Sequence, residues 1–170
     1  MRKPLNYYMK KLIKRKKIYV VSGTGKGLTD ISAFDAALTN AGIANYNLIY
    51  LSSIIPERSI IKIKRLKPKE AEYGKKLYVV MARCNQDIFG KEAWAGLGWT
   101  RDKTGRGLFA EHRSESKETV IRLIRNSLKD MKKLRTYKYG RINYSITGIK
   151  CKNRPVCAVV AAVYQSEGWF

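Results

Sequence analysis

The sequence predicts a single domain of mixed α+β or α/β class, in which helices cover a β-sheet. Short apolar, β-branched segments alternate with two amphipathic helical segments, which gives two blocks of strand, helix and strand. The chain of 170 residues has a hydrophobic fraction of 45%, which is enough for one buried core. It contains no internal repeat and no low-complexity linker, so a second domain is not expected.

In the first half of the chain, residues 18–21 predict a strand, because three of these four residues are β-branched and the fourth is a tyrosine. The glycine-rich segment 22–27 then predicts a loop. Apolar residues recur at helical spacing over 31–41, with Thr29 or Ser32 as the N-cap, and Gly42 is placed to end this helix. Further strands are expected at 46–51, 59–64 and 77–82.

In the second half, the segment 90–107 is rich in glycine and tryptophan, which favours close backbone packing and loops over a regular helix. Residues 117–134 form the clearest amphipathic helix of the sequence. Two strands, 141–150 and 156–164, close the chain, and we expect them to pair as a hairpin through 152–155.

The chain is strongly basic, with 35 Lys and Arg against 13 Asp and Glu and a net charge of +22. Eight of these cations, and no acid, lie within residues 1–17, which predicts a basic N-terminal arm before a domain at 18–170. An arm of this kind can contact nucleic acid through phosphate groups. A basic nucleic-acid-binding domain is therefore the alternative hypothesis for function, although such contact is not the expected role.

Several classes are disfavoured. The longest uncharged apolar run, 156–164, has nine residues, whereas a membrane-spanning helix needs about 20. Lysines interrupt any candidate signal sequence, and three cysteines at no ligand spacing favour reduced thiols, so we expect a cytoplasmic protein that binds no metal. The loop 22–27 lacks two residues of the phosphate-loop pattern, and His112 is interpreted as structural or solvent-facing.

One segment is far more specific. Phe34-Asp35, Ala37-Leu38, Ala41, Ile43, Asn45 and Asn47 precede Ser52-Ser53 and Pro56 at fixed spacing. This string resembles the pyruvoyl-dependent arginine decarboxylases, and segments 98–111 and 157–162 resemble two further parts of that family. The resemblance covers about 17–164 and implies an αββα sandwich of four layers, assembled as trimers or multiples of trimers. Neither the arm before Lys17 nor the high charge is a family trait.

The resemblance implies that the protein cuts its own Ser52–Ser53 bond. The hydroxyl of Ser53 attacks the carbonyl of Ser52, and elimination and hydrolysis leave a pyruvoyl group at position 53. The products are a β chain, 1–52, and an α chain, 53–170. The pyruvoyl group then replaces pyridoxal phosphate as cofactor, forming a Schiff base through which L-arginine loses CO₂ to give agmatine for polyamine biosynthesis.

The resemblance also assigns three further residues. Glu111 returns a proton to the substrate carbon, which requires a pKa raised by a dry pocket. Asn47, taken to lie on the same strand as Ser53, stabilises the oxyanion formed during self-cleavage. Asp35 binds the substrate guanidinium; without the motif it would be interpreted as a helix-surface acid. Another cationic amino acid remains an open alternative to arginine.

Overall fold

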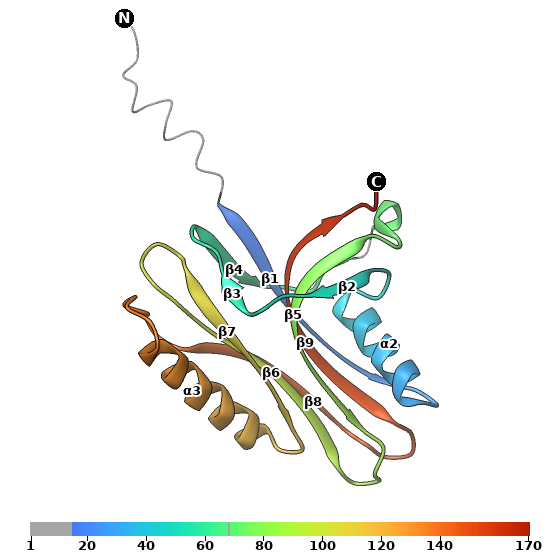
Figure 1. Ribbon diagram of the computed structural model, residues 1–170. Helices are drawn as coiled ribbons and strands as arrows, with labels where there is room; N and C mark the ends of the chain where they lie inside the picture. The colour runs from blue at the N-terminus through green and yellow to red at the C-terminus, as the bar shows by residue number, and fades with distance from the viewer. Residues whose placement is uncertain (1–14, 68) are drawn as a thin grey trace, which may run out of the picture.

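A computed structural model describes residues 15–67 and 69–170 as two stacked β-sheets with a helix on each outer face (Figure 1). The elements are β1 (Lys16–Lys26), α2 (Asp30–Ala41), β2 (Asn47–Tyr50), β3 (Ile54–Ile55), β4 (Ser59–Ile63), η1 (Glu70–Glu72), β5 (Lys76–Gln86), β6 (Glu92–Arg101), β7 (Gly107–Ser114), α3 (Lys117–Lys133), β8 (Asn143–Lys150) and β9 (Val156–Glu167). Sheet A has the strand order β2-β5-β9-β1-β4, and sheet B has the order β3-β7-β6-β8.

The apolar core has three layers, which confirms the sandwich. The first lies between the two sheets and includes Val160 of β9 and Phe109 of β7. The second lies between sheet A and α2, and the third between sheet B and α3. The residues of β9 are buried from Val156 to Tyr164 because this strand has one face in the first layer and the other in the second.

The expected hairpin of 141–150 with 156–164 is wrong. β8 pairs with β6 at the edge of sheet B, whereas β9 lies between β1 and β5 in sheet A. The short connection 151–155 therefore crosses from one sheet to the other. A fully apolar strand such as β9 is suited to a position covered on both faces, and sheet A provides it between α2 and sheet B.

The segment 22–27, expected as a loop, is largely strand, because β1 continues to Lys26. Its glycines permit helix α2 to lie directly on the strand: a Cβ atom at Gly23 would be 2.2 Å from the carbonyl oxygen of Ala37, and one at Gly25 would be 2.3 Å from the nitrogen of Ala37. Glycine at these positions serves helix–strand packing, and the sequence pattern was misinterpreted as a turn.

The segment 90–107, expected to favour close backbone packing and loops over a regular helix, contains all of β6 and the start of β7. Gly96 and Gly98 make room for helix α3, since a Cβ at Gly98 would be 2.1 Å from Cγ2 of Ile124. The two helices themselves are confirmed. Thr29 caps α2 with a reciprocal bond to Ser32, and Gly42 ends it with a left-handed φ of 81°.

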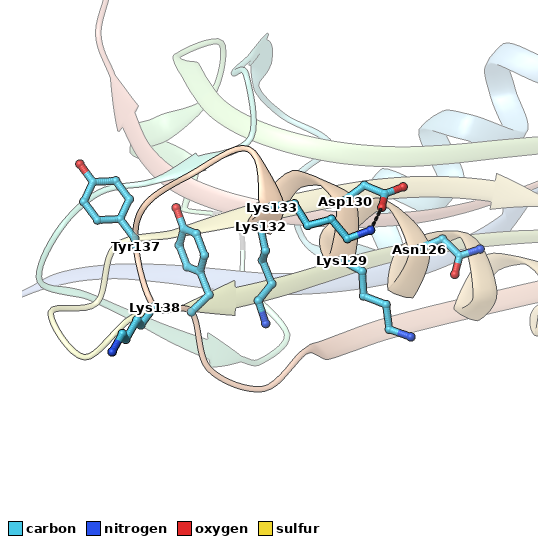
Figure 2. Close-up of a pocket in the computed structure, with 8 residues that line it drawn as sticks. Asn126, Lys129, Asp130, Lys132, Lys133, Tyr137 and Lys138 are labelled. Atoms are coloured by element: carbon cyan, nitrogen blue, oxygen red, sulfur yellow. Dashed lines mark hydrogen bonds and ion pairs between the residues drawn. The ribbon is translucent and has the colours of Figure 1, made fainter.

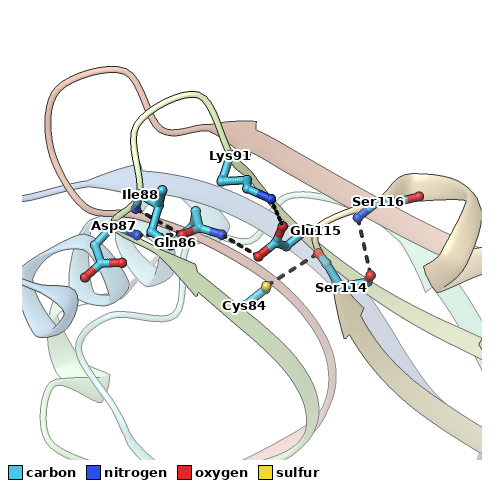
Figure 3. Close-up of polar contacts among 8 residues, drawn as sticks. All are labelled: Cys84, Gln86, Asp87, Ile88, Lys91, Ser114, Glu115 and Ser116. Atoms are coloured by element: carbon cyan, nitrogen blue, oxygen red, sulfur yellow. Dashed lines mark hydrogen bonds and ion pairs between the residues drawn. The ribbon is translucent and has the colours of Figure 1, made fainter.

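Polar side chains join the sheets at the end of β5 (Figure 3). The amide of Gln86 donates to Glu115 (3.2 Å) and accepts from the backbone of Asp87 and Ile88, while Lys91 pairs with Glu115 at 3.0 Å. These contacts tie sheet A to the chain that follows β7 in sheet B.

The expected arm, 1–17, falls mostly outside the described residues, which begin at Arg15, and β1 begins at Lys16. The division of the chain into an arm and a domain at 18–170 stays a prediction. No helix within 15–67 and 69–170 is long and apolar enough to cross a membrane.

Candidate active site

The Ser52–Ser53 bond lies where the chain crosses from sheet A to sheet B. β2 ends at Tyr50 in sheet A, and β3 begins at Ile54 in sheet B. Asn47 and Ser53 are therefore not on one strand, contrary to expectation, because the chain leaves sheet A between them. Ser53 has a left-handed φ of 64° and is 8% exposed, whereas Ser52 is exposed.

A left-handed backbone at a residue other than glycine costs about 1–3 kcal/mol and persists only where neighbouring contacts hold it. Two hydrogen bonds keep Ser53 in this conformation. The backbone N–H of Phe109 donates to the carbonyl of Ser53 (2.8 Å), and the hydroxyl of Tyr164 donates to the carbonyl of Ile54 (2.8 Å). The Phe109 and Tyr164 rings also pack edge to face, 6.3 Å between centroids.

The Ser53 hydroxyl faces the Glu111 carboxylate. Its Oγ lies 2.9 Å from Oε1 and 2.9 Å from Oε2, so the hydroxyl donates to the carboxylate. β7 positions Glu111 because alternate residues of the strand face the other sheet, with Phe109 buried there. A hydroxyl beside a carboxylate is a nucleophile beside a base, the arrangement needed for attack on a neighbouring carbonyl.

A pocket of about 420 Å³ opens at this point, lined by Ser52, Ser53, Phe109, Ala110, Glu111, His112, Ser127 and Met131. The Glu111 side chain is exposed rather than enclosed, because this pocket is open to the outside of the chain. Only the first two residues of β7 pair with β3, so the rest of this edge of sheet B is unpaired within the described chain. The dry pocket expected around Glu111 is not formed by one chain alone.

Sequence reasoning missed the contribution of His112 and α3 to this pocket. Nε2 of His112 lies 2.8 Å from the hydroxyl of Ser127, which joins the strand to the helix. Burial lowers the pKa of His112 below its ordinary 6.5, and the negative charge of Glu111 opposes this only in part. Burial, and then the charge of Glu111, raise the pKa of Tyr164. Strand alternation places His112 on the face of β7 opposite to Glu111, toward α3, so its part in the pocket depends on the packing of that helix.

The other two predicted site residues lie elsewhere in the chain. Asp35 is exposed on α2, the outer layer of sheet A, and Asn47 begins the edge strand β2, where its amide donates to the carbonyl of Gly74 (2.7 Å). Within the part of the chain that the structure describes, neither is hydrogen-bonded to Ser53 or Glu111. The fold thus brings together Ser52, Ser53 and Glu111, and leaves Asp35 and Asn47 apart from them.

Other candidate features give no competing catalytic site. The three cysteines are buried and free, and burial raises the pKa of Cys157 to about 11 and also raises that of Cys84. A larger pocket of about 650 Å³ lies at the end of α3 (Figure 2). Half of its lining residues are lysines, and none of them lines the Ser53 pocket. Among residues 15–67 and 69–170, no group of His, Cys, Asp or Glu is arranged to hold a metal.

Comparison with known proteins identifies relatives over nearly the whole chain. The family model of pyruvoyl-dependent arginine decarboxylase matches residues 17–168. The "Pyruvoyl-dependent arginine decarboxylase 2" of Archaeoglobus fulgidus is 30% identical over 151 residues, which cover 88% of this chain and 96% of that protein. The pyruvoyl-dependent arginine decarboxylase of Thermococcus sibiricus is 33% identical over 151 residues, covering 87% and 94%. That of Halobacterium salinarum is 37% identical over 100 residues, covering 59% and 62%.

Proposed function

This chain belongs to the pyruvoyl-dependent arginine decarboxylase family, and from that premise we propose that it cleaves itself at Ser52–Ser53 and converts L-arginine to agmatine and CO₂. The observation that carries the proposal is the contact of the Ser53 hydroxyl with both oxygens of Glu111 beside an exposed Ser52. In the cell the reaction supplies polyamine biosynthesis, and we place it in the cytoplasm.

Self-cleavage begins when Oγ of Ser53 attacks the carbonyl carbon of Ser52 and its proton passes to Glu111. The C–N bond then breaks, the nitrogen of Ser53 takes up the proton, and an ester joins Ser52 to Oγ of Ser53. Loss of the Cα proton breaks the Cβ–Oγ bond, which frees the Ser52 carboxylate and leaves dehydroalanine. Its imine tautomer reacts with water and releases ammonia, which leaves the pyruvoyl group on the α chain.

The backbone geometry of Ser53 favours the first of these steps. The bonds from Phe109 and Tyr164 hold its left-handed conformation, and its hydroxyl lies 2.9 Å from a proton acceptor, the Glu111 carboxylate. Because attack and proton transfer take place within one preorganised contact, little entropy is lost on reaching the transition state. Part of the backbone strain is released when the Ser52–Ser53 bond breaks.

The same residues fit the mature cofactor, because position 53 stays within the pocket and opposite Glu111. The pyruvoyl group supplies a ketone that binds the substrate amine and accepts the electrons left by CO₂. Glu111 then holds the proton that is delivered to the substrate α-carbon. It is close enough to do so because its carboxylate accepted a hydrogen bond from the Ser53 hydroxyl before cleavage. The site needs neither pyridoxal phosphate nor a metal in this scheme.

A single chain cannot present Asp35 to a substrate at Ser53, since sheet A separates α2 from sheet B. We therefore place the complete site between subunits of a homotrimer or a multiple of trimers. Asp35 of a neighbouring subunit pairs with the substrate guanidinium, for which a carboxylate is the matching group. Asn47 acts at the same interface as an oxyanion donor, and the neighbour closes the open edge around Glu111.

Intact-mass measurement of the purified protein tests self-cleavage. We expect fragments of 52 and 118 residues (170 − 52 = 118), and one uncut species for Ser53→Ala; an uncut wild-type chain would overturn the proposal. Agmatine release from arginine should be lost in Glu111→Gln and kept in Glu70→Gln, which alters an exposed glutamate in η1. Release of product from Glu111→Gln at the wild-type rate would remove Glu111 from the mechanism.

Subunit complementation tests the shared site. Asp35→Ala and Ser53→Ala chains are each expected to be inactive alone. Co-expressed, they form mixed oligomers in which some interfaces pair an intact Ser53 with an intact Asp35, so activity returns. A mixed oligomer without activity would show that both residues act within one chain.

A further inference from the structure

A second basic pocket lies where the start of β4 meets the turn between β6 and β7. It measures about 470 Å³ and is lined by Arg15, Arg58, Ser59, Ile60, Arg101, Asp102, Lys103, Thr104 and Gly105. None of these residues lines the Ser53 pocket. We call it the Arg58 pocket. A site that binds a cationic amino acid would not be built from these groups, so its ligand differs from the substrate.

The positive charges of the Arg58 pocket exceed the negative ones. Arg15, Arg58, Arg101 and Lys103 contribute four cations, and Asp102 is the single acid in its lining. Asp102 is already engaged, because its carboxylate accepts from Thr104 (2.7 Å) and pairs with Arg106 at 2.9 Å. Although burial alone would raise the pKa of Asp102, these bonds lower it, so the group stays ionised and bound to Arg106.

Ser59 adds an independent observation. It is 3% exposed, and its hydroxyl is the one buried side-chain oxygen or nitrogen without a hydrogen-bond partner among the described residues. A buried polar group left unpaired costs about 1–3 kcal/mol, so such groups are rare and call for an explanation. Ser59 is one of the residues that line this pocket, which is rich in guanidinium groups.

The backbone around Ser59 is fixed rather than loose. Arg58 has a left-handed φ of 60°, its N–H donates to the carbonyl of Thr104 (2.9 Å), and its carbonyl accepts from Lys16 (3.2 Å). Gly105 packs so closely that a Cβ there would be 3.0 Å from the nitrogen of Ser59. Arg101 donates to the carbonyl of Ser59 (2.8 Å). The backbone in the wall of the pocket is therefore held in place without a ligand.

We propose that the Arg58 pocket binds a phosphate-type oxyanion, held by the guanidinium groups of Arg58 and Arg101 and by the hydroxyl of Ser59. Planar guanidinium groups match the paired oxygens of phosphate better than lysine does. The site is independent of the decarboxylation chemistry. Its volume accommodates a diphosphate as well as a single phosphate, and the two are compared in the test below.

The basic pocket at the end of α3 serves as the matched control (Figure 2). Its lysines are similar in number, but Lys133 pairs with Asp130 (3.0 Å) and Lys132 donates to the carbonyl of Gly140 (3.1 Å). Its lining holds no buried unpaired polar group within the described residues. Lys129 can therefore be neutralised there to measure the effect of general surface charge alone.

Isothermal titration calorimetry of the full-length protein with inorganic phosphate and with pyrophosphate, at 0.15 M KCl, measures binding. We expect Arg58→Gln to weaken the affinity at least tenfold and Lys129→Gln to change it less than twofold. Equal losses in both variants would show diffuse surface charge and overturn the proposal, as would the absence of binding to the wild type. Tighter binding of pyrophosphate than of phosphate would identify the diphosphate as the better ligand.

Ser59→Ala separates a binding role from a structural one. Without ligand, the melting temperature should stay the same or rise, because an unpaired buried hydroxyl is removed. With ligand, the affinity should fall several-fold. Unchanged affinity in Ser59→Ala would remove the hydroxyl from the site and overturn the proposed arrangement. A change in arginine turnover is not expected in any of these variants.

Discussion

Tyr164→Phe removes the hydroxyl that donates to the carbonyl of Ile54, one residue beyond Ser53. The bond is 2.8 Å long and Tyr164 is 9% exposed, so water replaces the lost donor poorly. A hydrogen bond of this kind is worth about 1–2 kcal/mol once the unpaired carbonyl is included. If the bond is needed to hold Ser53 in its left-handed conformation, self-cleavage slows by a factor of about 5–30.

The rate is followed by intact mass during synthesis of the precursor in a cell-free system, as the fraction of chain cut at Ser52–Ser53. Tyr78→Phe is the matched control, because it removes a tyrosine hydroxyl that donates to Glu167, away from the cleavage site. A melting temperature lowered by about 2–4 °C per kcal/mol is expected of Tyr164→Phe in any case. Cleavage at the wild-type rate, despite that loss of stability, would refute the positioning role of Tyr164.

Three further predictions concern packing, pH and salt. Gly98→Ala places a Cβ 2.1 Å from Ile124 and should destabilise the fold by about 1–3 kcal/mol in a denaturant titration, while Gly168→Ala, whose nearest contact is 3.5 Å, should be neutral. The folded pKa of His112 lies below its unfolded value of 6.5, so the unfolded state binds the proton first and stability is lost as pH falls below about 6.5. His112→Gln should make the melting temperature depend less on pH in this range, and an unchanged pH dependence would contradict the prediction. Because the chain carries +22, added salt should raise kcat/KM for the cationic substrate, and a fall would show that attraction near the site dominates.

Much of the fold could be predicted from local patterns. The α3 helix follows from apolar spacing, and the end of α2 follows from Gly42 in a left-handed conformation. The glycine-rich segment 22–27 was misinterpreted because the same residue that permits a turn also permits a helix to lie against a strand, as at Gly25. Which of these applies depends on the partner element, and the local sequence does not contain that information.

The separation of β8 from β9 has a similar cause. Five residues between two strands fit a hairpin, and nothing local shows that the chain changes sheets there. The same holds at Ser52–Ser53, where the motif indicated the proposed cleavage site but not the crossover from sheet A to sheet B. Glu111 was predicted at the site, and the contact with Ser53 supports that placement. His112 was not predicted at the site, because its contact with Ser127 depends on helix α3, which packs over β7.

If the chain is cut at Ser52–Ser53 as proposed, the position of β1 in sheet A has a consequence for the two fragments. β1 belongs to the 52-residue fragment, yet it is hydrogen-bonded on one side to β9 and on the other to β4, both of which belong to the 118-residue fragment. After cleavage, recovery of the fold from the unfolded state becomes a bimolecular reaction. At the low concentration of a dilute cell extract, an unfolded molecule would have to find a partner fragment before it could refold, so the working lifetime of the mature protein is set by its rate of unfolding.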